Sequence, residues 1–262
     1  MVAQPESRRR AVEIGDGIVQ GEPAAGNFRL VLPAVEEGYA DAQVDDYGGL
    51  SRGDYLWGPG TTLALRARFS HGAGELKGTA GFGFWNAPFG PGTGWLPALP
   101  QAAWFFYASE PNDLPLAPVG RMGRGWFVST IDAGAPRALA WAPLAPLVVA
   151  LNQVAAVRRR LWPVVRRALG ISYRPVTAEM GEWHTYRLAW RPRGCFFWVD
   201  GEPVWQTPWR PRGPLGFVCW VDNQYLVARP TGRIRWGTLA TGREQWLEVE
   251  GLRLHGPASG AR

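Results

Sequence analysis

The sequence predicts an all-β protein, a sandwich of two antiparallel sheets with one helical insertion, and three observations carry this prediction. Short runs of alternating apolar and polar residues recur along the 262-residue chain, separated by turns that use its 34 Gly and 23 Pro. Residues 181–223 predict an antiparallel meander. Residues 143–169 break the alternating pattern with an Ala/Leu/Val-rich stretch that ends at Gly170 and predicts a helix.

The meander is the clearest element. Its aromatic-rich runs His184–Trp190 and Cys195–Val199 predict two neighbouring strands, and Leu215–Val221 predicts another after a connector rich in Pro and Arg. Asp200 and Gly201 follow the second run, and Asp-Gly between alternating runs is typical of a type I′ hairpin turn, because both central residues need positive φ.

Further strands extend this meander into a sandwich. We predict residues 1–26 to be a loose arm and residues 27–262 to be a single domain. In the last strand the apolar residues change phase at Gly251, as a β-bulge causes. The total of roughly a dozen strands exceeds an immunoglobulin-size sandwich and suits a large two-sheet jelly roll. The other predicted strands are 28–32, 39–47, 61–70, 78–86, 100–109, 125–132, 203–205, 233–236 and 246–254.

The helical insertion 143–169 combines an apolar stripe with a basic segment, and Pro163 is expected to kink or divide it. An apolar stripe followed by arginines is typical of a helix on an anionic membrane surface, or of a lid over a cleft. A helix packed across the sandwich with solvated arginines fits the same pattern, and we favour that interpretation. The stripe is Leu147, Leu151, Val154, Leu161 and Val165, and the candidate membrane or anion contacts are Arg158, Arg159, Arg160, Arg166 and Arg167.

Charge, apolar runs and the cysteines indicate the location and the partners that we expect for the protein. The net charge of +6 comes from basic residues that are scattered outside the insertion, which does not favour a nucleic-acid-binding protein. The N-terminus lacks an apolar core typical of a secretory signal, and no apolar run is long enough to span a bilayer, so we expect a cytoplasmic protein. Cys195 and Cys219 are expected to be buried thiols. No histidines have metal-ligand spacing, so neither a metal nor a cofactor is expected.

Four segments in this order resemble the concanavalin A-like lectin/glucanase superfamily: WHTYRLAW, FFWVDGEPVW, LGFVCWVDN and WLEVEGLRL. The architecture is most similar to that of family 16 glycoside hydrolases, and the resemblance covers roughly residues 60–255 without the helical insertion. It implies two curved antiparallel sheets whose concave face forms a carbohydrate-binding cleft.

The chain differs from those hydrolases in the strand that holds their catalytic residues. Their central strand holds the nucleophile and the acid/base in an E-x-D-x-x-E or E-x-D-x-E run, and retaining hydrolysis needs two such carboxyls about 5–5.5 Å apart. The corresponding strand here, 100–109, contains no Asp or Glu, and Glu110 and Asp113 come only beyond its end. We therefore expect no ordinary retaining glycosidase activity, and the sequence assigns no catalytic residue. Whether another reaction is catalysed stays open.

The candidate ligand site combines aromatic and polar side chains. Sugars stack on aromatic rings while carboxylates and amides bind their hydroxyls, although aromatic residues in strands more often fill a core. Alternating glycines at Gly81 and Gly83 leave room for a ligand or a neighbouring backbone. The polar face of 39–47 is more typical of a solvated face than of a binding strip. The predicted ligand-binding residues are Trp85, Asn86, Trp104, Phe106, Trp220, Asp222 and Asn223, with Gln43 and Asp45 beside them.

Three functions follow from these patterns. The first is carbohydrate binding in the aromatic cleft. The second is a protein or enzyme that handles an apolar small molecule at a membrane surface, with the basic helix as lid or docking element. The third is a structural or partner-binding module.

Overall fold

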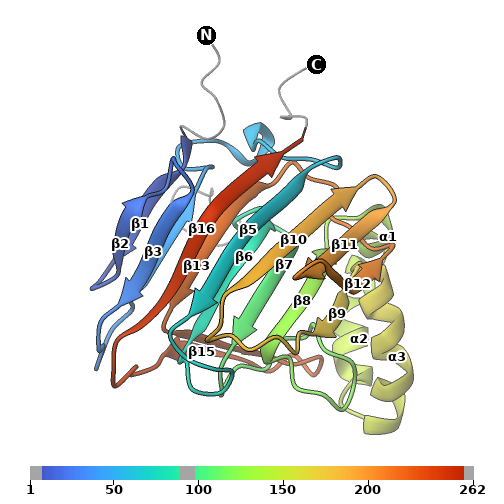
Figure 1. The fold of residues 1–262 in the computed structure, drawn as a ribbon. Helices are drawn as coiled ribbons and strands as arrows, with labels where there is room; N and C mark the ends of the chain where they lie inside the picture. The colour runs from blue at the N-terminus through green and yellow to red at the C-terminus, as the bar shows by residue number, and fades with distance from the viewer. Residues whose placement is uncertain (1–7, 89–97, 257–262) are drawn as a thin grey trace.

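The structure, a computed structural model, describes residues 8–88 and 98–256, so part of the loop predicted over 87–100 lies outside the described residues. Two seven-stranded antiparallel sheets pack face to face, and the second sheet lies in front of the first in Figure 1. The protein is therefore the two-sheet β-sandwich with one helical insertion that the sequence predicts.

The first sheet has the strand order β1-β4-β13-β6-β7-β8-β9. Most of its strands are predicted runs, but β1 and β9 were not expected. Its strands are β1 (Arg10–Ile14), β4 (Asp41–Asp45), β6 (Thr79–Trp85), β7 (Gln101–Ala108), β8 (Gly125–Asp132), β9 (Ser172–Pro175) and β13 (Gly216–Asp222).

The second sheet has the order β12-β11-β10-β5-β16-β3-β2 and contains the central meander. Asp200 and Gly201 have φ values of 52° and 83°, which confirms the predicted turn between β11 and β12. The register of β16 shifts between Glu250 and Arg253, which confirms the predicted bulge at Gly251. Its strands are β2 (Ile18–Glu22), β3 (Asn27–Leu32), β5 (Thr62–Phe69), β10 (His184–Arg191), β11 (Gly194–Val199), β12 (Glu202–Thr207) and β16 (Gln245–His255).

The core lies between the sheets and follows the alternation of each strand. Phe82 and Phe105 of the first sheet meet Tyr186 of the second, with ring centroids 5.1 Å from Tyr186 in both cases. Cys195 and Cys219 are free and buried in this core, as predicted. Because each fully buried large side chain stabilises the fold by about 1.5–3 kcal/mol, this layer holds the two sheets at a fixed spacing.

The prediction of a loose arm is wrong for residues 10–22. β1 pairs with β4 at the edge of the first sheet, and β2 pairs with β3 at the edge of the second. The strands are short and mostly exposed, which is why their composition looks like that of an arm. The pairing of β1 with β4 brings Arg10 beside Asp45.

The helical insertion forms α1 (Pro136–Leu139), α2 (Ala145–Leu151) and α3 (Ala155–Ala168) at the edge of the sandwich beside β9 (Figure 1). Pro163 lies inside α3 and does not divide it; the break comes at residues 152–154 instead. In the described part of the chain, no helix is long and apolar enough to cross a membrane.

A separate two-stranded ribbon follows the first sheet directly. β14 (Gln224–Ala228) was not predicted as a strand, and it pairs with β15 (Ile234–Thr238). The ribbon crosses the lower end of the sandwich in Figure 1. Asn152 and Gln153, at the end of α2, bind the carbonyls of Pro230 and Thr231 in the turn of the ribbon.

Candidate functional site

The outer face of the first sheet, turned away from the core, carries most of the predicted site. Strand pairing aligns its residues in rows: Trp220 lies between Gln43 and Gly81, and Phe106 lies next to Gly81 on the other side. Trp85, Trp104, Phe106, Trp220, Asp222, Gln43 and Asp45 all belong to this face by alternation. The structure therefore brings seven of the nine predicted residues to one surface.

Four of them form one continuous layer of rings, which we call the aromatic surface. The Trp104 ring lies 4.8 Å from Phe106, 5.7 Å from Trp220 and 6.2 Å from Trp85, centroid to centroid. Phe106 and Trp220 are buried, whereas Trp85 and Trp104 are half-buried. Trp220 is also anchored, because its Nε1 donates to the Thr79 hydroxyl at 2.9 Å. Trp85 and Trp104 are thus the rings that a ligand can reach.

The room above the glycines is taken by the protein's own rings. A Cβ atom on Gly81 would lie 3.0 Å from the Trp220 ring, and one on Gly83 would lie 2.6 Å from Cβ of Trp104. Tyr47 covers Gly216 in the same way. These glycines let aromatic side chains of neighbouring strands lie flat on the sheet, so they shape the site without being open to a ligand.

A polar strip borders the aromatic surface and consists of Arg10, Gln43, Asp45 and Tyr47. Arg10 Nε lies 3.0 Å from Asp45 Oδ1, and Gln43 Nε2 donates to Asp45 Oδ2 at 3.0 Å and to the Tyr47 hydroxyl at 3.3 Å. Trp85 Nε1 donates to the same hydroxyl at 2.9 Å and joins the two parts. The expectation of a solvated face over 39–47 is wrong, because Asp41, Asp45 and Tyr47 are buried.

Two carboxyl groups, Asp41 and Asp222, lie directly opposite each other on β4 and β13 and form what we call the carboxyl pair. Burial raises the pKa of Asp222 to about 7, although Thr79 and the Gln224 N–H hydrogen-bond to it and lower it. Burial and the neighbouring Asp222 charge raise the pKa of Asp41 well above its usual range. Both shifts favour the protonated form of the pair. Among the described residues, no three His, Cys, Asp or Glu groups could hold a metal ion.

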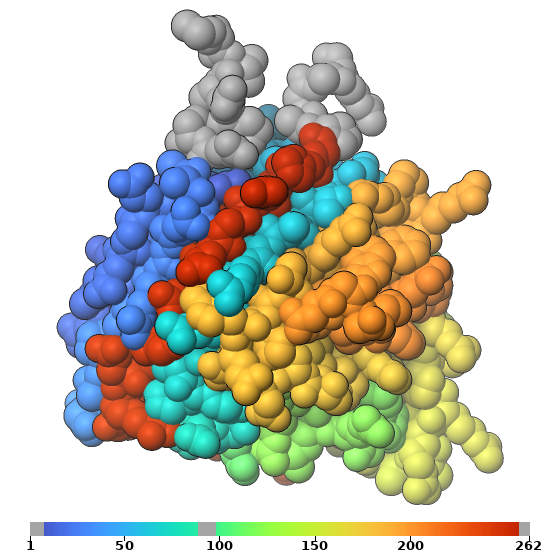
Figure 2. Space-filling model, in the orientation of Figure 1, coloured from blue at the N-terminus to red at the C-terminus, as the bar shows by residue number. Residues whose placement is uncertain are grey.

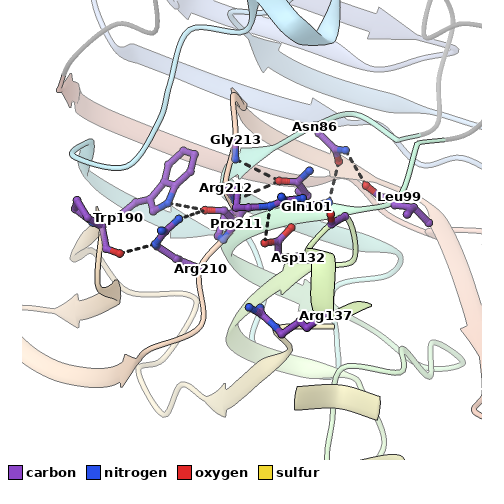
Figure 3. A network of polar contacts seen from close by, with 12 residues as sticks. Asn86, Leu99, Gln101, Asp132, Arg137, Trp190, Arg210, Pro211, Arg212 and Gly213 are labelled. Carbon is purple, nitrogen blue, oxygen red and sulfur yellow. Dashed lines mark hydrogen bonds and ion pairs between the residues drawn. The ribbon is translucent and has the colours of Figure 1, made fainter. Parts of the chain in front are cut away.

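Asn86 and Asn223 do not reach the aromatic surface. Asn86 directly follows Trp85 at the end of β6, but its side chain binds the neighbouring loop: its Nδ2 donates to Leu99 O and its Oδ1 accepts from the Gln101 N–H, both at 2.9 Å (Figure 3). Asn223 is fully buried, and its amide is used by the backbone of Gly38, Ala40 and Leu239. Both amides fasten loops at strand ends, so the structure does not bring these two residues together with the other seven, and their role as ligand-binding residues stays a prediction.

The five arginines of the insertion separate into two groups. Arg158 Nη1 binds the Asn152 carbonyl at 2.7 Å, and Arg166 Nη2 binds the Leu116 carbonyl at 2.7 Å, so both serve the fold. Burial lowers the pKa of Arg166. Arg159, Arg160 and Arg167 are exposed. The stripe divides as well: Val165 is buried, but Leu147, Leu151 and Val154 face solvent.

Sequence reasoning missed Arg10, Asp41 and Thr79. Arg10 was assigned to the arm, although the alternation in Arg10–Ile14 was a weak signal for a strand. Asp41 lies in the predicted strand 39–47, but the sequence did not show that it would face Asp222. That contact depends on the pairing of β4 with β13, which no local pattern reveals. His184 is a partly buried histidine whose Nδ1 lies 2.5 Å from Asp200 Oδ2.

No protein-family model and no curated protein matches the chain. Solved structures do resemble it. The pseudo β-1,3-glucanase and immunostimulatory antigen of Mycobacterium tuberculosis is 18% identical with a TM-score of 0.45, over 89% of this chain and 79% of that chain. A putative β-glucanase of Mycobacterium abscessus is 13% identical with a TM-score of 0.45, over 95% and 92%.

The carbohydrate recognition domain of Emp47p is 12% identical with a TM-score of 0.47, over 95% of this chain and 89% of that chain. The chain is thus similar to glucanase-like proteins and to a carbohydrate-recognition domain. With TM-scores below 0.5, these likenesses assign neither a ligand nor a reaction to it.

Proposed function

We propose that the outer face of the first sheet binds a carbohydrate chain, with sugar rings stacked on Trp85 and Trp104. The observation that carries the proposal is the juxtaposition of these two half-buried indoles with the polar strip, through the hydrogen bond from Trp85 to Tyr47. An indole face offers apolar area for the C–H face of a sugar, and its polar edge is already oriented. A sugar hydroxyl can accept from Arg10, whose side chain is exposed, and can donate to Gln43 Oε1, since the hydrogen bonds of Gln43 to Asp45 and Tyr47 use its Nε2.

Binding is tested by titrating the full chain with β-linked glucan and mannan oligosaccharides and following tryptophan fluorescence and calorimetric heat. Trp85→Ala is expected to weaken binding at least tenfold, since stacking on this ring is lost. Trp246→Ala is the matched control, because Trp246 is half-buried on the outer face of the other sheet. Absence of binding across the panel, or an equal loss in the control, contradicts the proposal.

We further propose that this binding occurs without ordinary retaining hydrolysis. The residues of β7 on this face are Ala102, Trp104, Phe106 and Ala108, none of which is a carboxylate. Asp45 is committed to Arg10 and Gln43, and Asp222 to Thr79. The test is reducing-sugar release from the oligosaccharide that binds best. Release that disappears in Asp41→Asn or Asp222→Asn would assign catalysis to the carboxyl pair and overturn this part.

An apolar small molecule is a second candidate ligand for the same face, because the rings of Trp104, Phe106 and Trp220 form an apolar layer. Gln43→Leu separates the two candidates. For a carbohydrate ligand, the loss of hydrogen-bonding groups lowers affinity; for an apolar ligand such as a naphthalene sulfonate dye, affinity stays equal or rises.

A further inference from the structure

A cavity of about 340 Å³ lies away from the aromatic surface, between the loop 113–121, the junction of α2 with α3, and the turn of the β14–β15 ribbon. We call it the arginine cavity. Its lining includes Arg121, Arg158, Arg229 and Arg233, and its single carboxylate is Asp113. Such an excess of guanidinium groups around a concave surface favours an anionic occupant.

Two of the four arginines have partners within the protein. Arg229 Nε lies 3.0 Å from Asp113 Oδ2, and Arg158 Nη1 binds the Asn152 carbonyl. Arg121 and Arg233 are exposed, and neither forms an ion pair with any residue that the structure describes. Their planar donor groups suit a phosphate, which guanidinium binds in bidentate fashion.

Exposed apolar residues adjoin the lining of the same cavity in the sequence. Met122, Val154 and Ile234 are 51%, 55% and 60% exposed, and each directly follows a residue of the cavity lining, namely Arg121, Gln153 or Arg233. Since consecutive Cα atoms are about 3.8 Å apart, the backbone of these three residues lies next to the cavity.

The ribbon continues this apolar rim. Trp236 is 75% exposed and shares a face of β15 with Ile234. Val149 of α2 lies against Gly232 in the turn of the ribbon and joins the helix to it. An exposed tryptophan beside arginines is typical of proteins that lie in the interface of a membrane.

We propose that the arginine cavity binds the phosphate of an anionic lipid headgroup while Met122, Val154, Ile234 and Trp236 enter the interfacial layer of the bilayer. Charge complementarity selects the anionic lipid, and the apolar rim distinguishes a membrane from a free anion, which offers nothing for these side chains to contact. The inference does not depend on the ligand of the aromatic surface, because the two sites share no residue.

The test is flotation of the full chain with vesicles of phosphatidylcholine alone, or with 30% phosphatidylglycerol. Binding to the anionic vesicles is expected to exceed binding to the neutral ones and to weaken with salt. Arg121→Gln with Arg233→Gln is expected to weaken it roughly 25-fold, at roughly fivefold for each arginine near the surface. Ile234→Ser with Trp236→Ser is expected to abolish it.

Arg193→Gln is the matched control, because Arg193 is exposed and lines another arginine-rich cavity, of about 260 Å³, that also contains Asp132 and Arg212. An equal loss in this control would mean that overall charge drives binding and would overturn the proposal, as would equal binding to both vesicles. Inorganic phosphate that displaces the protein fully at millimolar concentration would assign the cavity to a free anion instead. A concentration-dependent dimer that Ile234→Ser dissolves would assign the surface to a second copy of the chain, which also overturns the proposal.

Discussion

The two outer faces of the sandwich are both rich in tryptophan, but the partners of the rings differ. On the second sheet, Arg29 stacks on Trp246 at 4.1 Å and Arg66 on Trp183 at 4.5 Å, each measured from the guanidinium carbon to the ring centroid. Arg187 stacks on Trp198 at 4.8 Å. On the first sheet, the rings contact one another instead.

The carboxylates of the two outer faces also differ, in how far they are exposed to water. Glu248 and Glu250 on the second sheet pair with Arg68 and Arg66 and stay partly in water. On the first sheet, Asp41, Asp45 and Asp222 are buried. Figure 2 shows the outer face of the second sheet as a continuously filled surface. Two faces of similar composition therefore differ in burial, because the tryptophans of one stack with arginines and those of the other pack against aromatic rings.

The largest expected difference between the two faces concerns their tryptophans. Trp220→Ala is expected to lower the free energy of unfolding by about 3–5 kcal/mol, because it leaves a cavity beside Trp104 and Phe106. Trp246→Ala removes a solvated ring stacked with Arg29 and Arg68 and is expected to cost about 1 kcal/mol. Urea denaturation measures both, and equal losses would remove the distinction between the faces.

The second difference is in pH dependence. The pKa of Asp222 in the folded protein, about 7, lies above its usual value, so the folded state keeps a proton that the unfolded state releases. Stability from this group is complete below about pH 4 and is lost as pH rises toward about 7. Asp222→Asn keeps the acceptor oxygen for Thr79 without the charge. It is expected to match the wild type at about pH 3 and to exceed its stability by up to roughly 4 kcal/mol at pH 8, at about 1.4 kcal/mol per pH unit.

Asp200→Asn is the control from the second sheet, because the pKa of Asp200 is shifted in the opposite direction to that of Asp222. Burial raises the pKa of Asp200, but its hydrogen bonds with His184 and the Thr185 N–H together lower it by more, so the net shift is downward. Its contribution is therefore present above about pH 4, so Asp200→Asn loses stability at pH 8 and little at pH 3. Denaturation midpoints at several pH values measure both variants. If the stabilities of the two variants changed with pH in the same way, burial of Asp222 would not be the cause of the pH dependence.

Most of the fold could be predicted because it depends on local patterns. The turn at Asp200-Gly201 and the bulge at Gly251 are set by residues that tolerate positive φ, and the strands of the meander alternate clearly. The strands that were missed, β1, β2, β9 and β14, are short or mostly exposed, so they lack alternation strong enough to be recognised.

The site was predicted less completely because its geometry depends on pairing between distant segments. The aromatic residues share a face by alternation alone, and seven of nine predicted residues lie together. Asn86 and Asn223 stand next to strand ends, where alternation no longer applies and loop hydrogen bonds decide. The glycine pattern at Gly81 and Gly83 correctly indicated a close approach, but it could not show that Trp104 and Trp220 would take the space.

The third prediction tests the glycines that support the aromatic surface. Gly81→Ala is expected to cost about 1–3 kcal/mol, because the added methyl group meets the Phe105 carbonyl as well as the Trp220 ring. Gly58→Ala is the control, since nothing lies within 4 Å of a Cβ atom there, and it is expected to change stability by less than about 0.5 kcal/mol. Thermal unfolding measures both, and tolerance of alanine at Gly81 would mean that the rings do not rest on the sheet.

The smallest expected difference lies in the ion pairs of the two faces. Arg66 and Glu250 are both half exposed and 2.9 Å apart, so a double-mutant cycle is expected to give a coupling of about 0.5 kcal/mol that salt weakens. In the pair of Arg10 and Asp45 the carboxylate is buried and also accepts from Gln43 and the Gly48 N–H. Its coupling is expected to reach about 2 kcal/mol and to change little with salt, because a buried charged acceptor has lost its water. If 1 M sodium chloride weakened the Arg10–Asp45 coupling as much as the Arg66–Glu250 coupling, relative to 0.05 M, the polar strip would be as solvated as the second sheet. The strip would then lack the preorganised donors and acceptors on which the carbohydrate proposal depends.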